Sequence, residues 1–104
     1  YVYYLMEAMI RGRVEGGLTP ETARQLTVQT VLGAAQMVKM TGEDPLILRK
    51  KVTSPNGTTQ AALETLDAFR VQESLVKAVL RAAEKAREMG DEIGRAAGND
   101  SESR

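Results

Sequence analysis

The sequence predicts an all-α domain of five helices, and three observations carry this prediction. Apolar residues recur at helical spacing along most of the 104 residues, and no segment keeps the alternation of a half-buried strand for long. Thr19-Pro20 and Asp44-Pro45 each place a capping side chain before a proline, the pattern of a helix start. Gly16-Gly17 and Gly42 stand where two helices would end. The length suits a single core.

The first two helices follow from these signals. The first is expected from Tyr1 to about Val14. The second begins at Pro20, with Thr19 as its N-cap, and continues to about Met40. Its inner stripe is dominated by small residues, which let helices approach closely: Ala23, Leu26, Thr27, Thr30, Val31, Ala34, Met37 and Val38.

Three further helices are expected after Gly42. A short one runs from Pro45 to about Val52. After a polar turn, Thr58 or Thr59 caps a fourth helix that ends near Phe69 and buries Ala62, Leu63 and Leu66. The fifth runs from Val71 to about Ile93 and carries a charged outer face. We therefore expect a domain over residues 1–97 and a polar tail over residues 98–104.

Composition excludes several classes of function. The 14 basic residues balance the 14 acidic ones, so the chain lacks the positive charge that nucleic acids and anionic membranes attract. No apolar run approaches the length of a membrane span. Because the chain has neither Cys nor His, no structural zinc site and no metal are expected. No signal or transit peptide is visible, which favours a cytoplasmic protein.

The expected core is poor in large side chains. Many of its positions are Ala, and the only aromatic residues are Tyr1, Tyr3, Tyr4 and Phe69. Alanine buries little apolar area, so apolar burial within one copy offsets little of the conformational entropy that the chain loses on folding. We therefore expect an interlocked homodimer in which residues 19–40 and 71–93 form the interface.

The turn between the third and fourth helices is where chemistry is expected. It reads Val52-Thr53-Ser54-Pro55-Asn56-Gly57-Thr58-Thr59 and offers hydroxyls and backbone N–H groups at the start of a helix. The first N–H groups of a helix lack intrahelical partners and carry partial positive charge, so they attract anions. Taken alone, such a turn is more often an ordinary capped loop.

The segment from Pro45 to Asp67 resembles the C-terminal signature of pyrroline-5-carboxylate reductases, which reduce a cyclic imine to proline. The resemblance extends over residues 1–90, and the positions that carry it are Pro45, Leu48, Val52 to Thr59, Ala62-Leu63 and Leu66-Asp67. The commonest members have two glycines where this chain has Asn56-Gly57. Asn tolerates left-handed backbone better than other residues with a Cβ atom, so we expect the turn to persist.

The resemblance implies the C-terminal dimerisation domain of an NAD(P)H-dependent oxidoreductase of proline biosynthesis, and some members assemble their dimers into rings. It implies that NADPH or NADH binds in an N-terminal domain missing from these residues, which lack the strand, Gly-x-Gly-x-x-Gly and helix order of a dinucleotide site. We expect the chain to be a fragment that is inactive alone.

The resemblance also assigns roles to residues. Thr59 aligns with the family threonine that faces the substrate ring nitrogen, so it is the catalytic candidate, orienting the imine and relaying a proton. The substrate carboxylate would lie against the N–H groups of Gly57, Thr58 and Thr59. The predicted substrate-binding set is Val52, Ser54, Pro55, Asn56, Gly57, Thr58 and Thr59. Glu7, the other candidate acid, is expected to face solvent.

Two other interpretations remain open. The chain could be a purely structural helical dimerisation module, in which the turn is only a connector. It could also be the helical domain of a related imine reductase or hydroxyacid dehydrogenase. Such enzymes usually place a lysine on a helix as acid or base, but the lysines here are expected at the surface: Lys39, Lys50, Lys51, Lys77 and Lys85. A dinucleotide-binding segment upstream would separate both enzymes from the structural module.

Overall fold

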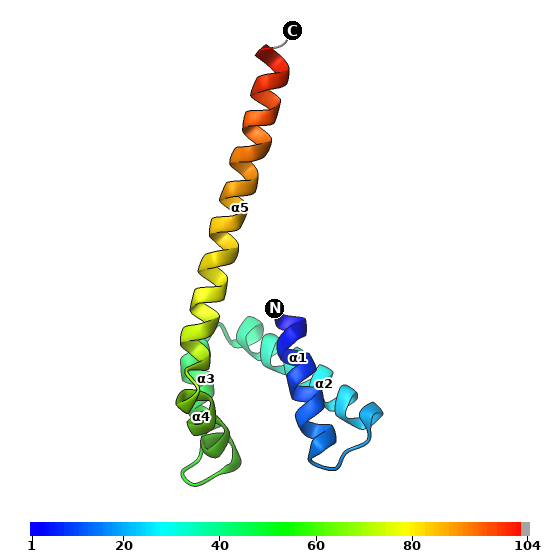
Figure 1. The fold of residues 1–104 in the computed structure, drawn as a ribbon. Helices are drawn as coiled ribbons and strands as arrows, with labels where there is room; N and C mark the ends of the chain where they lie inside the picture. The colour runs from blue at the N-terminus through cyan, green and yellow to red at the C-terminus, as the bar shows by residue number, and fades with distance from the viewer. Residues whose placement is uncertain (103–104) are drawn as a thin grey trace. The chain divides into compact units, whose positions relative to one another are not determined.

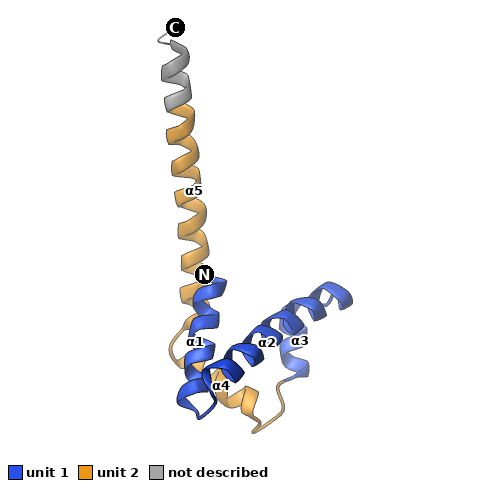
Figure 2. Cartoon of the chain, turned by 90° about the vertical axis from the view of Figure 1, so that its right-hand side faces the viewer, with its two compact units in different colours: residues 1–52 blue, residues 53–104 orange. Residues whose placement is uncertain are grey.

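The computed structural model describes the backbone of residues 1–102 and the side chains of residues 1–95. The described residues contain helices and no strand, which confirms the all-α prediction (Figure 1). The helices are α1 (Val2–Glu15), α2 (Pro20–Thr41), α3 (Pro45–Lys51), α4 (Thr58–Ala68) and α5 (Val71–Glu102). They fall into two compact units, Tyr1–Val52 and Thr53–Arg104, coloured separately in Figure 2.

Helices α1 and α2 form a helical hairpin in the first unit. Gly17, at φ 113°, makes the turn between them, in a backbone region that favours glycine. Thr19 caps α2 as predicted, because its side-chain oxygen accepts the N–H of Thr22 at 3.2 Å and Pro20 follows it. Gly42 ends α2 in the left-handed conformation at φ 69°.

The packing between α1 and α2 uses only one row of the expected inner stripe. Ala23 and Thr27 are fully buried, and Val31 and Val38 are half-buried. The other members of the stripe are exposed, so the prediction that they face inward is wrong for a single copy: Leu26, Thr30, Ala34 and Met37. These four lie on other rows of the helix and stay exposed in one chain.

The contact between Thr27 and Arg13 predicts a stability effect. Arg13 Nη1 donates to Thr27 Oγ1 at 2.6 Å, and the Thr27 side chain is fully buried. A hydrogen bond from a charged donor contributes about 1.5 to 3 kcal/mol, so Thr27→Val should lower the free energy of unfolding by that amount. Urea titration at fixed protein concentration measures it. Thr30→Val is the matched control, since the exposed Thr30 hydroxyl bonds only to the Leu26 carbonyl of its own helix. Equal effects for the two variants would contradict the prediction.

Helix α3 starts and ends as predicted. Asp44 Oδ1 accepts the N–H of Leu46 at 2.9 Å, Pro45 is the first helical residue, and Val52 follows the last. Between α2 and α3 lies an apolar groove of about 420 Å³. Its lining consists of Ala34, Met37, Val38, Pro45, Leu48, Arg49, Lys51 and Val52. We refer to it as the α2–α3 groove.

Helices α4 and α5 form the second unit and contact each other. Arg70, between them, has φ 53°, a left-handed conformation that residues with a Cβ atom seldom adopt. The expected burial on α4 is wrong for a single copy, because Ala62 and Leu66 are exposed and Leu63 is half-buried. The described α5 covers too little of α4 to enclose them.

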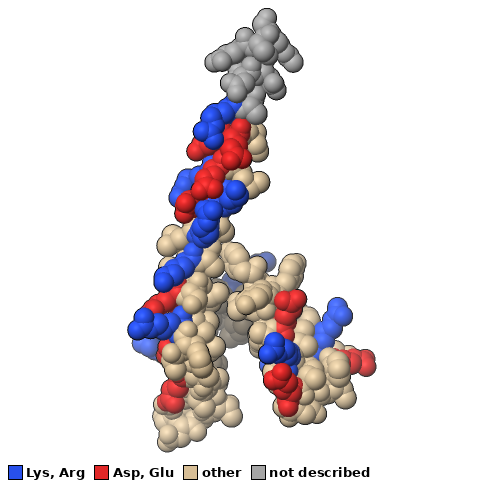
Figure 3. Space-filling model, in the orientation of Figure 1, with Lys and Arg blue, Asp and Glu red and all other residues tan. Residues whose placement is uncertain are grey.

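Helix α5 begins at Val71 as predicted, but its expected end near Ile93 is wrong, because the helix continues to Glu102. Charged pairs stabilise its solvent face without burial: Arg81 lies 3.4 Å from both Glu84 and Glu88, and Lys85 lies 3.8 Å from Glu88. Figure 3 shows basic and acidic side chains interspersed along this helix. Of the predicted tail, residues 98–102 have helical backbone and residues 103–104 lie outside the described residues. The domain boundary at residue 97 stays a prediction.

No helix within residues 1–102 combines the length and the apolar character that crossing a membrane requires.

Candidate functional site

The site begins with a tight turn that precedes α4. The Gly57 N–H donates to the Ser54 carbonyl oxygen at 3.1 Å, which closes a four-residue turn. Pro55 occupies its second position and Asn56, at φ 60°, its third. A proline followed by a residue with positive φ is the pattern of a type II turn. The expectation that Asn56 would accept left-handed backbone is confirmed.

A side chain further along the chain holds this turn. The Oε1 atom of Gln60 accepts the N–H of Asn56 at 2.5 Å. A left-handed conformation costs a residue with a Cβ atom about 1 kcal/mol, somewhat less for Asn, and a hydrogen bond contributes about 1 kcal/mol. The two effects are of similar size, so the Gln60 bond offsets the strain at Asn56.

A glycine is favoured at residue 57 because there is little room for a Cβ atom, and not because its backbone is strained. Its φ is −86°, which any residue can adopt. A Cβ atom at this position would lie 2.5 Å from Ser54 Oγ and 3.2 Å from the Ser54 carbonyl oxygen. The absence of a side chain therefore lets Ser54 fold over the start of α4.

The first turn of α4 has N–H groups without intrahelical acceptors. Gly57 is the N-cap, so the predicted cap at Thr58 or Thr59 is wrong, and no side chain caps the helix. The first helical bond runs from the Ala61 N–H to the Gly57 carbonyl at 3.2 Å. The N–H groups of Thr58, Thr59 and Gln60 therefore have no acceptor within the helix. The Gly57 N–H, also expected to be free, is used by the turn.

Six of the seven predicted binding residues lie together in this turn and helix start: Ser54, Pro55, Asn56, Gly57, Thr58 and Thr59. Val52 belongs to the first unit, where it is 66% exposed and lines the α2–α3 groove. Thr59 is half-buried. Glu7, on α1, is exposed, as expected.

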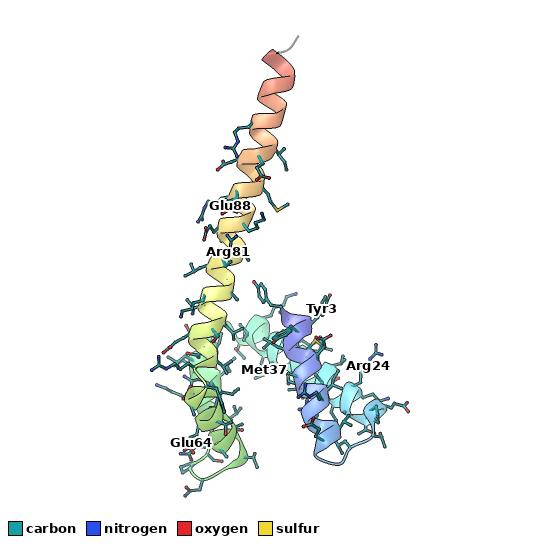
Figure 4. The ribbon with its side chains drawn as sticks, viewed as in Figure 1. Tyr3, Arg24, Met37, Glu64, Arg81 and Glu88 are labelled. Carbon is teal, nitrogen blue, oxygen red and sulfur yellow. The ribbon has the colours of Figure 1, made fainter. Side chains whose placement is uncertain are left out.

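Two shallow hollows flank the turn. One, of about 220 Å³, is lined by Asn56, Gly57, Gln60, Ala61 and Glu64, and Figure 4 labels Glu64 on α4. The other, of about 190 Å³, is lined by Thr53, Ser54, Pro55 and Gln60. Thr59 lines neither, whereas Gln60 lines both.

Gln60 is the site residue that the sequence reasoning missed. It stands three residues after the N-cap Gly57. This is the spacing of the glutamine or glutamate in a capping box, whose side chain reaches back to a backbone N–H before the helix. That spacing could have indicated from the sequence that the Gln60 side chain bonds to the turn.

This arrangement suits an uncharged cradle for a small anion. The helix start supplies N–H donors, and the threonines beside them supply hydroxyls. Within the described part of the chain, no three acidic side chains gather as a metal site would require. No group of the turn is redox-active, so a redox reaction here would need a separate cofactor.

Comparison with known proteins identifies relatives over most of the chain. Residues 1–89 match the family model described as pyrroline-5-carboxylate reductase dimerisation. Pyrroline-5-carboxylate reductase 1 of Bacillus spizizenii is 43% identical over 93 residues, which are 89% of this chain and 31% of that protein. The Arabidopsis thaliana pyrroline-5-carboxylate reductase is 44% identical over 89 residues, 86% of this chain and 32% of that protein.

Solved structures agree. The crystal structure of Plasmodium falciparum pyrroline carboxylate reductase with NADP bound gives a TM-score of 0.81 at 33% identity, covering 86% of this chain and 34% of that one. The Coxiella burnetii pyrroline-5-carboxylate reductase gives 0.79 at 43% identity, covering 85% and 33%. The chain thus spans about a third of the length of the relatives it matches.

Proposed function

This chain belongs to the pyrroline-5-carboxylate reductase dimerisation family, and from that premise we propose that it is the substrate-binding and dimerisation part of an enzyme that reduces pyrroline-5-carboxylate to L-proline with NAD(P)H. The whole enzyme includes residues outside this chain, since the matched relatives are about three times as long. The observation that carries the proposal is the start of α4, where N–H donors without intrahelical acceptors follow a turn that closes at Gly57.

In this proposal the substrate carboxylate binds at the start of α4. The N–H groups of Thr58, Thr59 and Gln60 donate to it, and the partial positive charge of the helix start stabilises it. Ser54 lies close over Gly57, so its hydroxyl borders the same space. Pro55 forms the apolar side of the turn. The role predicted for Val52 rests on the family resemblance alone.

Thr59 is the proposed catalytic residue. In this role its hydroxyl would orient the ring nitrogen and relay a proton from solvent to it, regaining its own proton in the same step. The half-buried position of Thr59, one residue inside the helix start, supports this role. The residues contribute position and electrostatics, because the nicotinamide supplies the hydride.

The nicotinamide cofactor does not fit the described residues of this chain. They contain no strand, and so no strand-to-helix glycine loop that could cradle a pyrophosphate. We propose that NADPH or NADH binds to another part of the enzyme. The NADP bound to the Plasmodium falciparum relative supports a cofactor of this class.

Steady-state assay of the intact protein tests the proposal. Oxidation of NADPH or NADH should depend on pyrroline-5-carboxylate and should yield an equal amount of L-proline. A protein that binds itself but reduces nothing would favour the structural module. Reduction of a different imine or oxidation of a hydroxy acid, without activity on pyrroline-5-carboxylate, would favour the related reductase.

We further propose that a second copy of the chain covers the apolar faces of α2 and α5. The single copy buries little, with Ala23 the one fully buried apolar residue among those described. Large apolar side chains on α5 are 46% to 68% exposed, namely Val76, Val79, Leu80, Met89 and Ile93. Exposed apolar faces of this extent mark interfaces. The family is named for dimerisation, which supports a second copy as the partner.

The α2–α3 groove offers a test of this interface. Ala34 is exposed in the single copy and lines the groove with Met37 and Leu48. A carboxylate here would be buried without a partner on association, so Ala34→Glu should weaken self-association by about a hundredfold or more. Sedimentation equilibrium measures it. Gln36→Glu adds the same charge to an exposed position of α2 outside the groove lining and should associate normally. Normal assembly of Ala34→Glu would place the interface elsewhere.

A further inference from the structure

The bond between Gln60 and the turn carries an inference that deepens the proposed function and rests on it. Gln60 Oε1 accepts the N–H of Asn56, and Gln60 is the residue shared by the linings of the two hollows beside the turn. Its side chain is half-buried. It therefore ties the residue before the N-cap to the first turn of α4.

This tie acts on a residue that is otherwise poorly held. Asn56 adopts φ 60°, where a glycine would rest without strain. The Ser54 to Gly57 hydrogen bond closes the turn, but it does not engage the N–H of Asn56. Without an acceptor from Gln60, Asn56 gains by leaving the left-handed region, and the turn over Gly57 then rearranges.

We propose that Gln60 is a positioning residue for substrate binding: its side chain holds Asn56 in the left-handed conformation and so keeps the donors of Thr58 and Thr59 open to the substrate carboxylate. Gln60 thereby does for Asn56 what a glycine at that position would do by itself. Loss of the Gln60 bond should lower substrate affinity and leave kcat nearly unchanged, because neither the hydroxyl of Thr59 nor the hydride donor takes part in that bond.

The test is a double-mutant cycle in the intact enzyme, with pyrroline-5-carboxylate as the varied substrate and NADPH saturating. Gln60→Met keeps the length of the side chain and removes its acceptor, so the KM for pyrroline-5-carboxylate should rise about fivefold, with kcat changed less than twofold. In the Asn56→Gly background the same change should raise KM less than twofold, since a glycine needs no tie. Gln72→Met, at an exposed position near the start of α5, should match the parent.

Each outcome has one meaning. An equal rise in KM in both backgrounds would show that Gln60 touches the substrate directly and would overturn the inference, as would an unchanged KM for Gln60→Met. A parent enzyme that does not reduce pyrroline-5-carboxylate would refute the proposed function instead. In that case, amide hydrogen exchange of the turn still tests the tie. Gln60→Met should speed this exchange in the parent background, but it should not speed it further in the Asn56→Gly background.

Discussion

Replacing Thr59 by Val is expected to lower kcat about a hundredfold or more in the intact enzyme. Valine keeps the branched shape, so the half-buried position on α4 stays filled and folding should be nearly unchanged. What is lost is the hydroxyl that we propose lies at the reacting nitrogen, and a donor lost at a reacting centre costs about 2 to 4 kcal/mol of transition-state stabilisation. Steady-state kinetics measure kcat, and thermal unfolding checks the fold.

Two variants separate this role from a structural one. Thr59→Ser restores a hydroxyl and should recover most of the lost rate. Thr65→Val makes the same change on the exposed side of α4, where the hydroxyl bonds only to the Ala61 carbonyl, and should leave kcat at the parent value. Near-normal turnover of Thr59→Val would remove Thr59 from the mechanism.

Gly57→Val is expected to act on substrate binding. A Cβ atom at residue 57 would lie 2.5 Å from Ser54 Oγ and 3.2 Å from the Ser54 carbonyl oxygen, so the Ser54 side chain must rotate and the turn must shift. The added methyl groups also occupy the space in front of the first N–H groups of α4. We expect the KM for pyrroline-5-carboxylate to rise about a hundredfold. The new side chain blocks access of the carboxylate, and the N–H donors that would bind it are misoriented.

Gly12→Val is the control for Gly57→Val. A Cβ atom at Gly12 meets nothing within 4 Å, and Gly12 is exposed on α1. This variant should keep the KM of the parent. If Gly57→Val folds and binds substrate with normal affinity, the carboxylate does not lie at the start of α4, and the proposed cradle is wrong.

Local signals in the sequence predicted most of the fold. Thr19-Pro20 and Asp44-Pro45 act within one helical turn of themselves, so their geometry could be expected without knowing the rest of the molecule. Gly42 ends α2 for a similar local reason. The end of α5 could not be predicted from its apolar stripe, because the helix continues to Glu102, beyond Ile93, where the predicted stripe stops.

Burial could not be predicted in the same way. Ala62 and Leu66 have the spacing of a buried face, but spacing does not tell whether this chain or a second copy provides the cover. The same applies to Ala34 and Met37 on α2. A pattern records that a face is apolar, and only tertiary or quaternary contacts decide where it is buried.

The turn and the helix start that follows it were predicted from the sequence, but their internal bonds were not. The turn of Ser54 to Gly57 and the left-handed Asn56 follow from turn chemistry. The cap was misassigned because threonine is usually the stronger cap, whereas here the close approach of Ser54 selects Gly57. The substrate-binding roles of these residues stay predictions.

Helix α4 has a consequence for how the two proposed activities communicate. It is 11 residues long, begins at the proposed substrate cradle and leads through Arg70 into α5, whose apolar face we propose a second copy covers. A short helix transmits a displacement with little bending, so any shift of its first turn on ligand binding would reach the start of α5. Thermodynamic linkage then makes the effect mutual: the factor by which substrate strengthens pairing of the subunits equals the factor by which pairing strengthens substrate binding. Dilution of the enzyme would in this way lower its affinity as well as its assembly.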